Sequence, residues 1–406
     1  MLTVLRCDKI YTESGVIDGY IILENKMIQD ICEQYDGEID VDFRGKKIIP
    51  GLIDTHNHGF LGYPMRTSEN YTIDHETAIQ GYLKGLVAYG VTGVFPTCSI
   101  DKIASIATFA KDNKEKGAKI LGIHSEGPWL NRVGEKGIKK GFIHPSKEIA
   151  EKMVNDGKGQ LKLVSLSPEI ESIESVTRVM KDKDVTLAIA HTDYLYENVN
   201  KCIDQKGFRV MTHLGNAMTG LHHRDVGAIG AGLLNNNVYC EVICDFIHVC
   251  KEMVQIMLSV KDLNKIIMIS DNSEYTALPA GVYQGTDDKT TIEVGKDGSI
   301  HTETGKIQGS SIPMIYGLKN LVQELDYDLQ EVLKLSSKNC CDLYKLENRG
   351  ILKIGNYADI VVIDDDFTVE CTYVEGNLVY DNSTKIEDLQ NKDFILKHKI
   401  TQCIYK

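Results

Sequence analysis

Residues 47–58 read KIIPGLIDTHNH, a short apolar run that ends in two histidines. Seven further runs of this kind follow, and longer segments of helical character separate them. The runs are VTGVFPTCS (91–99), ILGIHSEGP (120–128), LKLVSLSPE (161–169), TLAIAHT (186–192), RVMTHLGNA (209–217), VYCEVICDFIH (238–248) and IIMISD (266–271). Apolar runs that alternate with helices are typical of βα units around a parallel sheet. Eight units predict an α/β fold, the (β/α)₈ or TIM barrel.

Both ends of the chain carry a different pattern. Residues 1–48 contain alternating runs such as VIDGYIILENKMI (16–28), bounded by glycines and charges, which indicate antiparallel strands. Residues 350–382 have the same character, with strands expected near 359–363 and 372–380. We therefore expect the two ends to pair into one small β-sandwich domain. The predicted division is a small β domain (1–48 and 350–382), a catalytic barrel (49–349) and a charged C-terminal appendage (383–406) to which we assign no function.

Composition excludes several classes of protein. The net charge of -13 disfavours nucleic acid as a general partner, because phosphate backbones attract clustered lysines and arginines. Eleven scattered cysteines without a Cys-x-x-Cys motif fit a reducing, cytoplasmic setting. Near the N-terminus, charges and glycines interrupt every apolar run before a signal segment or membrane span is complete. We expect a small-molecule partner, neither nucleic acid nor membrane.

His56 and His58 stand two residues apart on the first predicted barrel strand. Alternate residues of a strand share one face, so both imidazoles point the same way, which suits a metal ion. The alternative is a pair of hydrogen-bonded core or turn histidines. Their place at a strand end favours the metal, because barrel active sites lie at the carboxyl ends of the strands.

Three further strand ends add ligand-type residues. Glu126 closes the third run, and the Gly-Pro after it leaves the carboxylate at the rim. His191 and His213 close the fifth and sixth runs, which are neighbours in a barrel. Two imidazoles and one carboxylate leave a coordination position open for water, as a catalytic zinc-type site requires. The alternatives are a surface carboxylate and two core histidines.

Asp271 closes the eighth run and precedes Asn272 and Ser273. A single carboxylate at this place is suited to act as a general base beside a metal-activated water. The alternative is a turn or N-cap aspartate, which the following Asn-Ser also fits.

Together these positions resemble the amidohydrolase superfamily, and within it the N-acetylglucosamine-6-phosphate deacetylases. The segments that carry the resemblance are EGPWLN (126–131), LSPE (166–169), THLGNAM (212–218), HRDVGAIG (223–230), DFIHV (245–249) and QGSSIPM (308–314). With PGLIDTHNHG (50–59) and IGNYADIVVID (354–364), the resemblance covers about residues 1–382.

The resemblance implies a role for each position. Glu126, His191 and His213 become the principal metal ligands, Asp271 the catalytic acid/base, and His56 and His58 a second metal position. The implied cofactor is a divalent metal, foremost zinc, with iron, manganese or cobalt as alternatives. The subtype with a carbamylated lysine is excluded, because the end of LKLVSLSPE offers no lysine there.

The resemblance also implies a sugar-phosphate pocket. Its residues are Asn216 and Ala217, Arg224 for the phosphate, His248 for the sugar or its acyl group, and Ile307, Gln308 and Gly309. Without the resemblance, Arg224 would be interpreted as a solvated surface charge. The chain departs from the family at Lys139, in KGIKKGFIHP (136–145), where family members usually place a histidine near the substrate.

The implied function is hydrolysis of the acetamide of N-acetylglucosamine-6-phosphate to glucosamine-6-phosphate and acetate, in amino-sugar catabolism, by a homodimer. One alternative is an amidohydrolase for N-acetylgalactosamine-6-phosphate or another N-acyl amine. Another, from a different class, is a catalytically inactive barrel used for binding.

Overall fold

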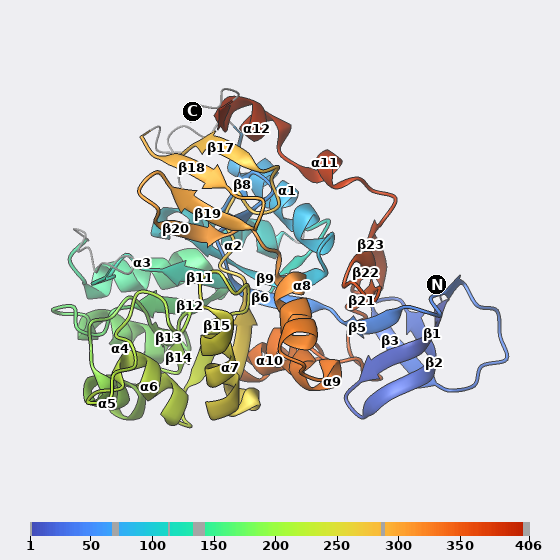
Figure 1. Ribbon diagram of the computed structural model, residues 1–406, viewed down its shortest axis with the longest axis horizontal. Coiled ribbons are helices and arrows are strands. Elements are labelled where there is room, and N and C mark those ends of the chain that lie inside the picture. Colours follow the sequence, from blue (N-terminus) through green and yellow to red (C-terminus); the bar gives the residue numbers. More distant parts are fainter. Residues whose placement is uncertain (1, 67–72, 113, 133–142, 286–288, 401–406) are drawn as a thin grey trace.

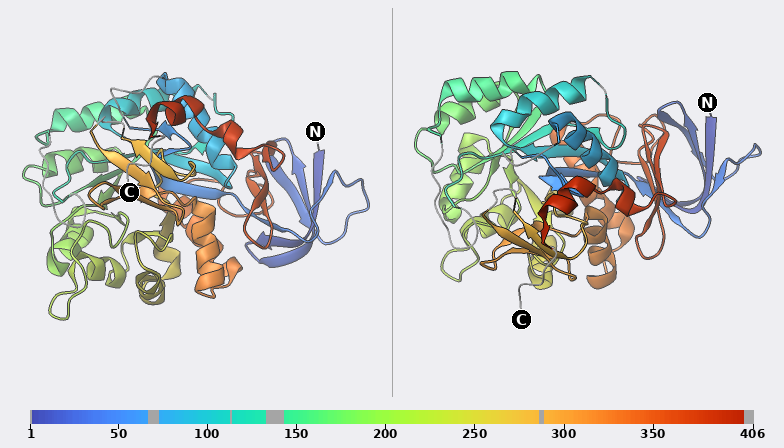
Figure 2. Two further views of the ribbon diagram at one scale, coloured as in Figure 1. Left: turned by 45° about the horizontal axis from the view of Figure 1, so that its top comes forward. Right: turned by 90° about the horizontal axis from the view of Figure 1, so that it is seen from above.

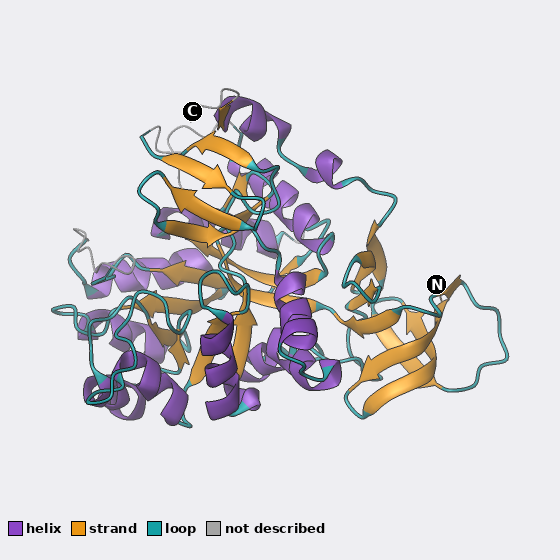
Figure 3. Cartoon of the chain, viewed as in Figure 1, coloured by secondary structure: helices purple, strands orange, loops and turns teal. Residues whose placement is uncertain are grey.

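A computed structural model of the chain describes residues 2–66, 73–112, 114–132, 143–285 and 289–400. A large body of strands and helices lies beside a smaller body of strands that contains the N-terminus (Figures 1 and 3). Within the described part of the chain, no helix is long and apolar enough to cross a membrane.

The larger body is a parallel barrel. Its strands are β6 (Leu52–Asn57), β9 (Val91–Cys98), β11 (Ile123–Glu126), β12 (Leu161–Leu166), β13 (Thr186–Ile189), β14 (Val210–Met211), β15 (Tyr239–Ile243) and β16 (Ile266–Ile269), hydrogen-bonded in this order. The last strand meets the first at its carboxyl end, where the backbone N of Asp271 donates to the carbonyl O of His56 over 3.0 Å. Thus the predicted (β/α)₈ barrel is confirmed.

One helix follows each strand around the outside of the barrel. The helices are α1 (His75–Val87), α2 (Ile103–Lys111), α3 (Lys147–Gly157), α4 (Glu174–Asp182), α5 (Tyr196–Lys206), α6 (Gly227–Leu234), α7 (Lys251–Val260) and α8 (Met314–Lys319). Further short elements are β7 (Gly59–Phe60), β8 (Tyr63–Pro64), β10 (Lys119–Ile120), α9 (Leu329–Val332), 3₁₀ helices at Ile100–Lys102, Leu263–Lys265 and Leu333–Ser336, and a π-helix at Asn320–Glu324.

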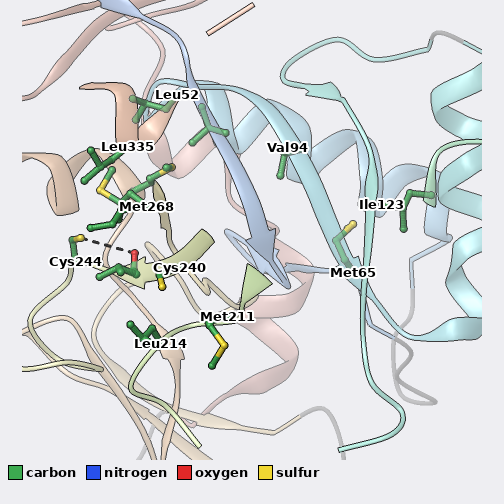
Figure 4. Close-up of a cluster of buried hydrophobic side chains, with 14 of the residues drawn as sticks. Leu52, Met65, Val94, Ile123, Met211, Leu214, Cys240, Cys244, Met268 and Leu335 are labelled. Carbon is green, nitrogen blue, oxygen red and sulfur yellow. Dashed lines mark hydrogen bonds between the residues drawn. The ribbon is translucent and has the colours of Figure 1, made fainter. Parts of the chain in front are cut away.

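Both faces of the barrel strands are buried, which explains why their sequences are continuously apolar. In β16, Ile267 and Ile269 point into the barrel, whereas Ile266 and Met268 pack against the helices. Figure 4 shows part of this outer layer. Helix α10 (Lys338–Tyr344) closes the amino-terminal end of the barrel, since Nδ2 of Asn339 donates to the carbonyl O of Ile266 over 2.6 Å. Glu126, His191, His213 and Asp271 lie at the opposite, carboxyl end of the strands.

The smaller body is one sheet built from both ends of the chain, as predicted. Its strands are β1 (Leu2–Thr12), β2 (Gly15–Glu24), β3 (Met27–Cys32), β4 (Val41–Asp42), β5 (Lys47–Pro50), β21 (Ile360–Ile363), β22 (Val369–Val374) and β23 (Asn377–Asp381). Strand β21 shows the two-residue period: Ile360 and Val362 face the core of this sheet, and Val361 and Ile363 face the barrel. The domain boundaries remain a prediction.

One expected strand, 372–380, is wrong in detail. The chain turns at Glu375 and Gly376, so that β22 ends and β23 begins inside that range. Gly376 has a φ of +73°, and a Cβ on it would lie 2.2 Å from the carbonyl O of Asn25. This close approach, which a local pattern does not reveal, fixes the turn.

A second small sheet is inserted between β16 and α8, and the sequence analysis missed it. Its strands are β17 (Gly281–Gln284), β18 (Thr291–Val294), β19 (Ser299–Thr302) and β20 (Ile307–Ser310), and β24 (Lys399–Ile400) pairs with β17. Helices α11 (Ile386–Leu389) and α12 (Lys392–His398) lead to β24. Because Phe394 of α12 is buried beside Tyr275, the C-terminal segment packs on this sheet (Figures 1 and 2).

A buried ion network connects the base of the barrel to the small domain. The guanidinium of Arg349, after α10, donates to the carboxylates of Asp359 and Glu375, and all three side chains are at most 10% exposed. The ammonium of Lys26 lies 2.7 Å from Glu375, but its side chain is 54% exposed.

We expect Arg349→Met to lower the free energy of unfolding by about 3 kcal/mol, because it leaves two buried carboxylates without their cation. Urea unfolding followed by circular dichroism measures the change. Lys26→Met is the matched control and should lose less than about 1 kcal/mol, since exposed ion pairs contribute little. Equal losses for the two variants would contradict the assigned importance of Arg349.

Candidate metal centre

Three strand ends bring a carboxylate and two imidazoles together at the open end of the barrel. Glu126 ends β11, and His191 and His213 lie just beyond β13 and β14. The Nε2 atoms of His191 and His213 lie 3.1 and 3.0 Å from Oε1 of Glu126, and 3.1 Å from each other. The structure thus gathers the three residues predicted as principal metal ligands.

A strained backbone aims these side chains. His191, His213 and Asp271 have φ values of 50°, 32° and 51°, in the left-handed region. Each such residue costs about 1 kcal/mol or more and persists where surrounding contacts enforce it, often at functional sites. Here the left-handed turn comes directly after the strand and directs each side chain toward the barrel opening.

The hydrogen bonds of His191 show that the cluster suits a cation. Nδ1 of His191 lies 2.6 Å from the carbonyl O of Arg132, and a carbonyl only accepts, so the neutral imidazole carries its proton on Nδ1. Its Nε2 is then a bare lone pair that faces a carboxylate oxygen of Glu126 at 3.1 Å. Two lone pairs repel unless a cation lies between them, and ligand atoms on a tetrahedral zinc ion are about 3.4 Å apart. The donor set therefore fits a divalent metal ion.

A second group lies beside the first and shares Glu126. Nε2 of His58 is 3.2 Å from Oδ1 of Asp271 and 3.3 Å from Oε2 of Glu126. Nε2 of His56 lies 3.2 Å from that of His58, while its Nδ1 lies 3.3 Å from Oε2 of Glu241. His56, His58 and Asp271 thus form a second potential ligand set.

Not every polar residue at the strand ends joins these groups. His124 shares a strand with Glu126, but its Nδ1 lies 3.0 Å from the hydroxyl of Thr97 and its Nε2 lies 2.7 Å from that of Ser165. It is a hydrogen-bonded core histidine.

The electrostatics of the cluster favour ionised carboxylates. Burial raises the pKa of the Glu126 carboxyl, but the adjacent imidazoles of His191, His213 and His56 outweigh this and hold the pKa well below its usual range. Burial also raises the pKa of Asp271, and the neighbouring imidazoles of His56 and His58 reverse the effect. Both groups are therefore ionised at neutral pH, as a ligand and a general base must be.

His248 faces this centre from the loop after β15. Its Nδ1 lies 2.8 Å from Oδ2 of Asp245, whose Oδ1 accepts from the backbone N of Ile247 and of His248 over 2.8 and 2.9 Å. Burial lowers the pKa of His248, but the bond to Asp245 raises it more. The ring is thus fixed in orientation.

The other predicted pocket residues lie in the loops after the barrel strands or outside the described residues. Asn216 and the buried Ala217 follow His213 directly, and Nδ2 of Asn216 donates to the carbonyl O of His213 over 3.2 Å. Arg224 is exposed in the next loop, where its backbone N lies 3.3 Å from Nδ1 of His222. Lys139 lies outside the described residues.

Ile307, Gln308 and Gly309 belong to β20, which passes beside the catalytic candidate Asp271. Gly309 has a φ of +81°, and a Cβ there would lie 3.0 Å from the Cβ of Ser273 and 3.2 Å from the carbonyl O of Asp271. A glycine is therefore required where the inserted sheet meets the barrel.

The sequence analysis missed four residues that orient this centre: Arg66, Arg132, Glu241 and Asp245. Glu241 carries a usable signal, since it is a single acidic residue within the apolar strand β15. Arg132 acts through its backbone carbonyl, so its side-chain type carries no information.

Comparisons with known proteins match one family model and several deacetylases. The model of the amidohydrolase family matches residues 48–379. The chain is 30% identical to the N-acetylglucosamine-6-phosphate deacetylase of Vibrio furnissii, over 90% of this chain and 92% of that protein. It is 24% identical to the N-acetylgalactosamine-6-phosphate deacetylase of Escherichia coli O157:H7, over 93% and 99%. The structure of the N-acetylglucosamine-6-phosphate deacetylase of Thermotoga maritima superposes with a TM-score of 0.78 at 27% identity, covering 94% of this chain and 100% of that one.

We expect Glu126→Gln to weaken metal binding at least about 100-fold, because the substitution removes the anionic ligand common to both groups. Mass spectrometry of bound metal after dialysis against a weak chelator measures the loss. Glu293→Gln, at an exposed position of β18, is the control and should retain the metal of the parent protein. Full metal retention by Glu126→Gln would exclude Glu126 as a ligand.

Proposed function

The chain belongs to the amidohydrolase family, and on this basis we propose that it hydrolyses the acetamide of N-acetylglucosamine-6-phosphate to glucosamine-6-phosphate and acetate. The observation that carries the proposal is the carboxylate–imidazole centre with Asp271 beside it, at the open end of the barrel. It occurs in a chain that aligns over 90% of its length with a deacetylase of this substrate.

Glu126, His191 and His213 would hold the metal ion. A divalent ion there polarises a substrate carbonyl and lowers the pKa of water to about 7. Imidazole and carboxylate donors in this number favour zinc, and iron, manganese or cobalt would accept the same ligands. Glu126 and His191 need no further deprotonation, because the Glu126 carboxyl is ionised and Nε2 of His191 is bare.

Asp271 moves the proton in the reaction. Its ionised carboxylate accepts a proton from the attacking water, and then donates it to the amide nitrogen as the carbon–nitrogen bond breaks, so that the amine leaves neutral. Nε2 of His58, 3.2 Å from Oδ1 of Asp271, lies at hydrogen-bond distance and helps to fix this carboxylate.

His248 and the loops bind the sugar phosphate. With Nδ1 of His248 paired to Asp245, its Nε2 is left to contact the acyl oxygen or a sugar hydroxyl. Arg224, on the exposed loop beyond Asn216 and Ala217, offers a planar fork that matches phosphate oxygens. Ile307, Gln308 and Gly309, on the strand beside Asp271, would contact the sugar. These roles remain predictions.

Two alternatives compete with this assignment. Hydrolysis of N-acetylgalactosamine-6-phosphate has support from a relative of 24% identity, against 30% for the relative that acts on the gluco sugar. A barrel used only for binding is disfavoured, because three metal ligands and an ionised acid/base are all present.

The setting that we propose is the cytoplasm, with a homodimer as the working assembly. The ten cysteines within the described residues are free thiols, which fits a reducing compartment. A closed two-fold dimer is the commonest symmetric assembly of soluble proteins.

The first test is acetate release by the metal-quantified protein from N-acetylglucosamine-6-phosphate, N-acetylgalactosamine-6-phosphate and unphosphorylated N-acetylglucosamine. We expect release to be fastest from the phosphorylated gluco sugar and to stop after chelation, returning when the divalent ion is restored. If a metal-loaded protein cleaves none of the three, the sugar-phosphate assignment fails and the amidohydrolase fold remains.

Arg224→Ala is the partner variant in this assay. It should lose most of the preference for the phosphorylated sugar, while its rate with the unphosphorylated sugar changes little. An unchanged preference would remove Arg224 from the phosphate site.

Asp271→Asn should lower turnover by about 10³-fold, because an amide cannot shuttle the proton. The variant should keep its fold and the ion held by Glu126, His191 and His213, as circular dichroism and metal analysis will show. Asp262→Asn, exposed at the opposite end of β16, is the matched control and should keep full turnover. Near-normal turnover in Asp271→Asn would refute the acid/base role.

A further inference from the structure

Arg66 reaches the metal centre from outside the barrel strands. It follows β8, in the hairpin that starts directly after His58, and the backbone N of Met65 donates to the carbonyl O of His58 over 2.8 Å. Although its side chain is 51% exposed, Nε of Arg66 lies 2.8 Å from Nδ1 of His58, and Nη2 lies 3.7 Å from Oε2 of Glu126. A positive charge therefore lies beside the second ligand group, formed by His56, His58 and Asp271.

The direction of the Arg66–His58 hydrogen bond decides where the proton of His58 lies. A guanidinium has only N–H donors, so Nδ1 of His58 must accept. A neutral imidazole then carries its proton on Nε2, the atom that faces Oδ1 of Asp271 at 3.2 Å and Oε2 of Glu126 at 3.3 Å. Both oxygens are acceptors. His58 is thus arranged to donate a hydrogen bond, not to offer a lone pair.

His191 shows the opposite arrangement in the same structure. Its Nδ1 faces a carbonyl, which leaves Nε2 bare, as metal-bound histidines commonly do. The two histidines therefore differ: His191 presents a free lone pair to the first ligand group, whereas His58 presents an N–H to the second. A second cation would have to displace the guanidinium or its hydrogen bond, and would meet the repulsion of the charge on Arg66.

Nearby carboxyl groups also stabilise the position of Arg66. Its guanidinium lies near two carboxyl groups, Glu126 at 3.7 Å and, within electrostatic range, Glu274 in the loop after β16. It supplies positive charge where Glu126 and Asp271 gather negative charge. Without Arg66, a second metal ion would have to balance this negative charge.

We propose that Arg66 takes the place of a second metal ion, so that this chain binds one divalent ion, at Glu126, His191 and His213. His58 then serves as the hydrogen-bond partner of Asp271 and Glu126, while Nδ1 of His56 pairs with Glu241. The inference rests on the proposed metal-dependent function and specifies the metal content of that same site.

Metal stoichiometry tests the inference without an activity assay. The parent protein, Arg66→Met and Arg209→Met are loaded with excess zinc, passed through a desalting column, and analysed for zinc per chain by mass spectrometry. Arg209, exposed before β14 at the opposite end of the barrel, is the charge-matched control. We expect about one ion per chain in the parent and in Arg209→Met, and about two in Arg66→Met.

His58→Asn separates the two positions. It should leave the single ion of the parent protein in place, and should reduce Arg66→Met from two ions to one. Two ions in the parent protein, with one lost in His58→Asn, would overturn the inference even if Arg66→Met does not fold. A folded Arg66→Met that still binds one ion would also overturn it. A parent protein that binds no ion would instead count against the proposed function.

Discussion

The site depends on the hydrogen bonds of one buried carboxylate, that of Asp54. Its Oδ2 accepts from the hydroxyl of Ser270 over 2.5 Å and from Nδ2 of Asn57 over 3.0 Å, and its Oδ1 lies 3.3 Å from the backbone N of His56 and of Ser270. Burial raises the pKa of Asp54, and these bonds offset that cost. These bonds connect β16 to β6 and so close the barrel. They also place Asp271 beside His56 and His58.

Much of this arrangement could be predicted from sequence, because a barrel fold brings the carboxyl ends of all its strands to one end of the molecule. An apolar run closed by Glu126, His191 or His213 is a local signal, and parallel strands bring such ends together without further information. A strand position alone does not identify a ligand. His124 lies on the same strand as Glu126, but the hydroxyls of Thr97 and Ser165, far away in the chain, pair with both of its ring nitrogens.

Contacts between distant segments limit what sequence reveals. The inserted sheet escaped prediction because its strands have only four residues each between β17 and β20, too few to show a period, although Asp297-Gly298 marks a turn. The role of Arg66 could not be predicted, because its effect on His58 depends on the direction of one hydrogen bond. Glu241 and Asp245 act on other side chains and never reach the centre themselves.

The segments EGPWLN and LSPE are best understood as one scaffold for His191. The backbone N of Asn131 lies 2.7 Å from the hydroxyl of Ser167, and its Nδ2 donates to Glu169 over 3.0 Å. That hydroxyl in turn lies 2.8 Å from the carbonyl O of His191, which also accepts from the backbone N of Arg132 over 2.9 Å. These bonds hold the strained, left-handed His191, and the carbonyl of Arg132 selects its tautomer. The end of β11 and the loop after it thus supply one candidate ligand, Glu126, and orient the lone pair of another, His191.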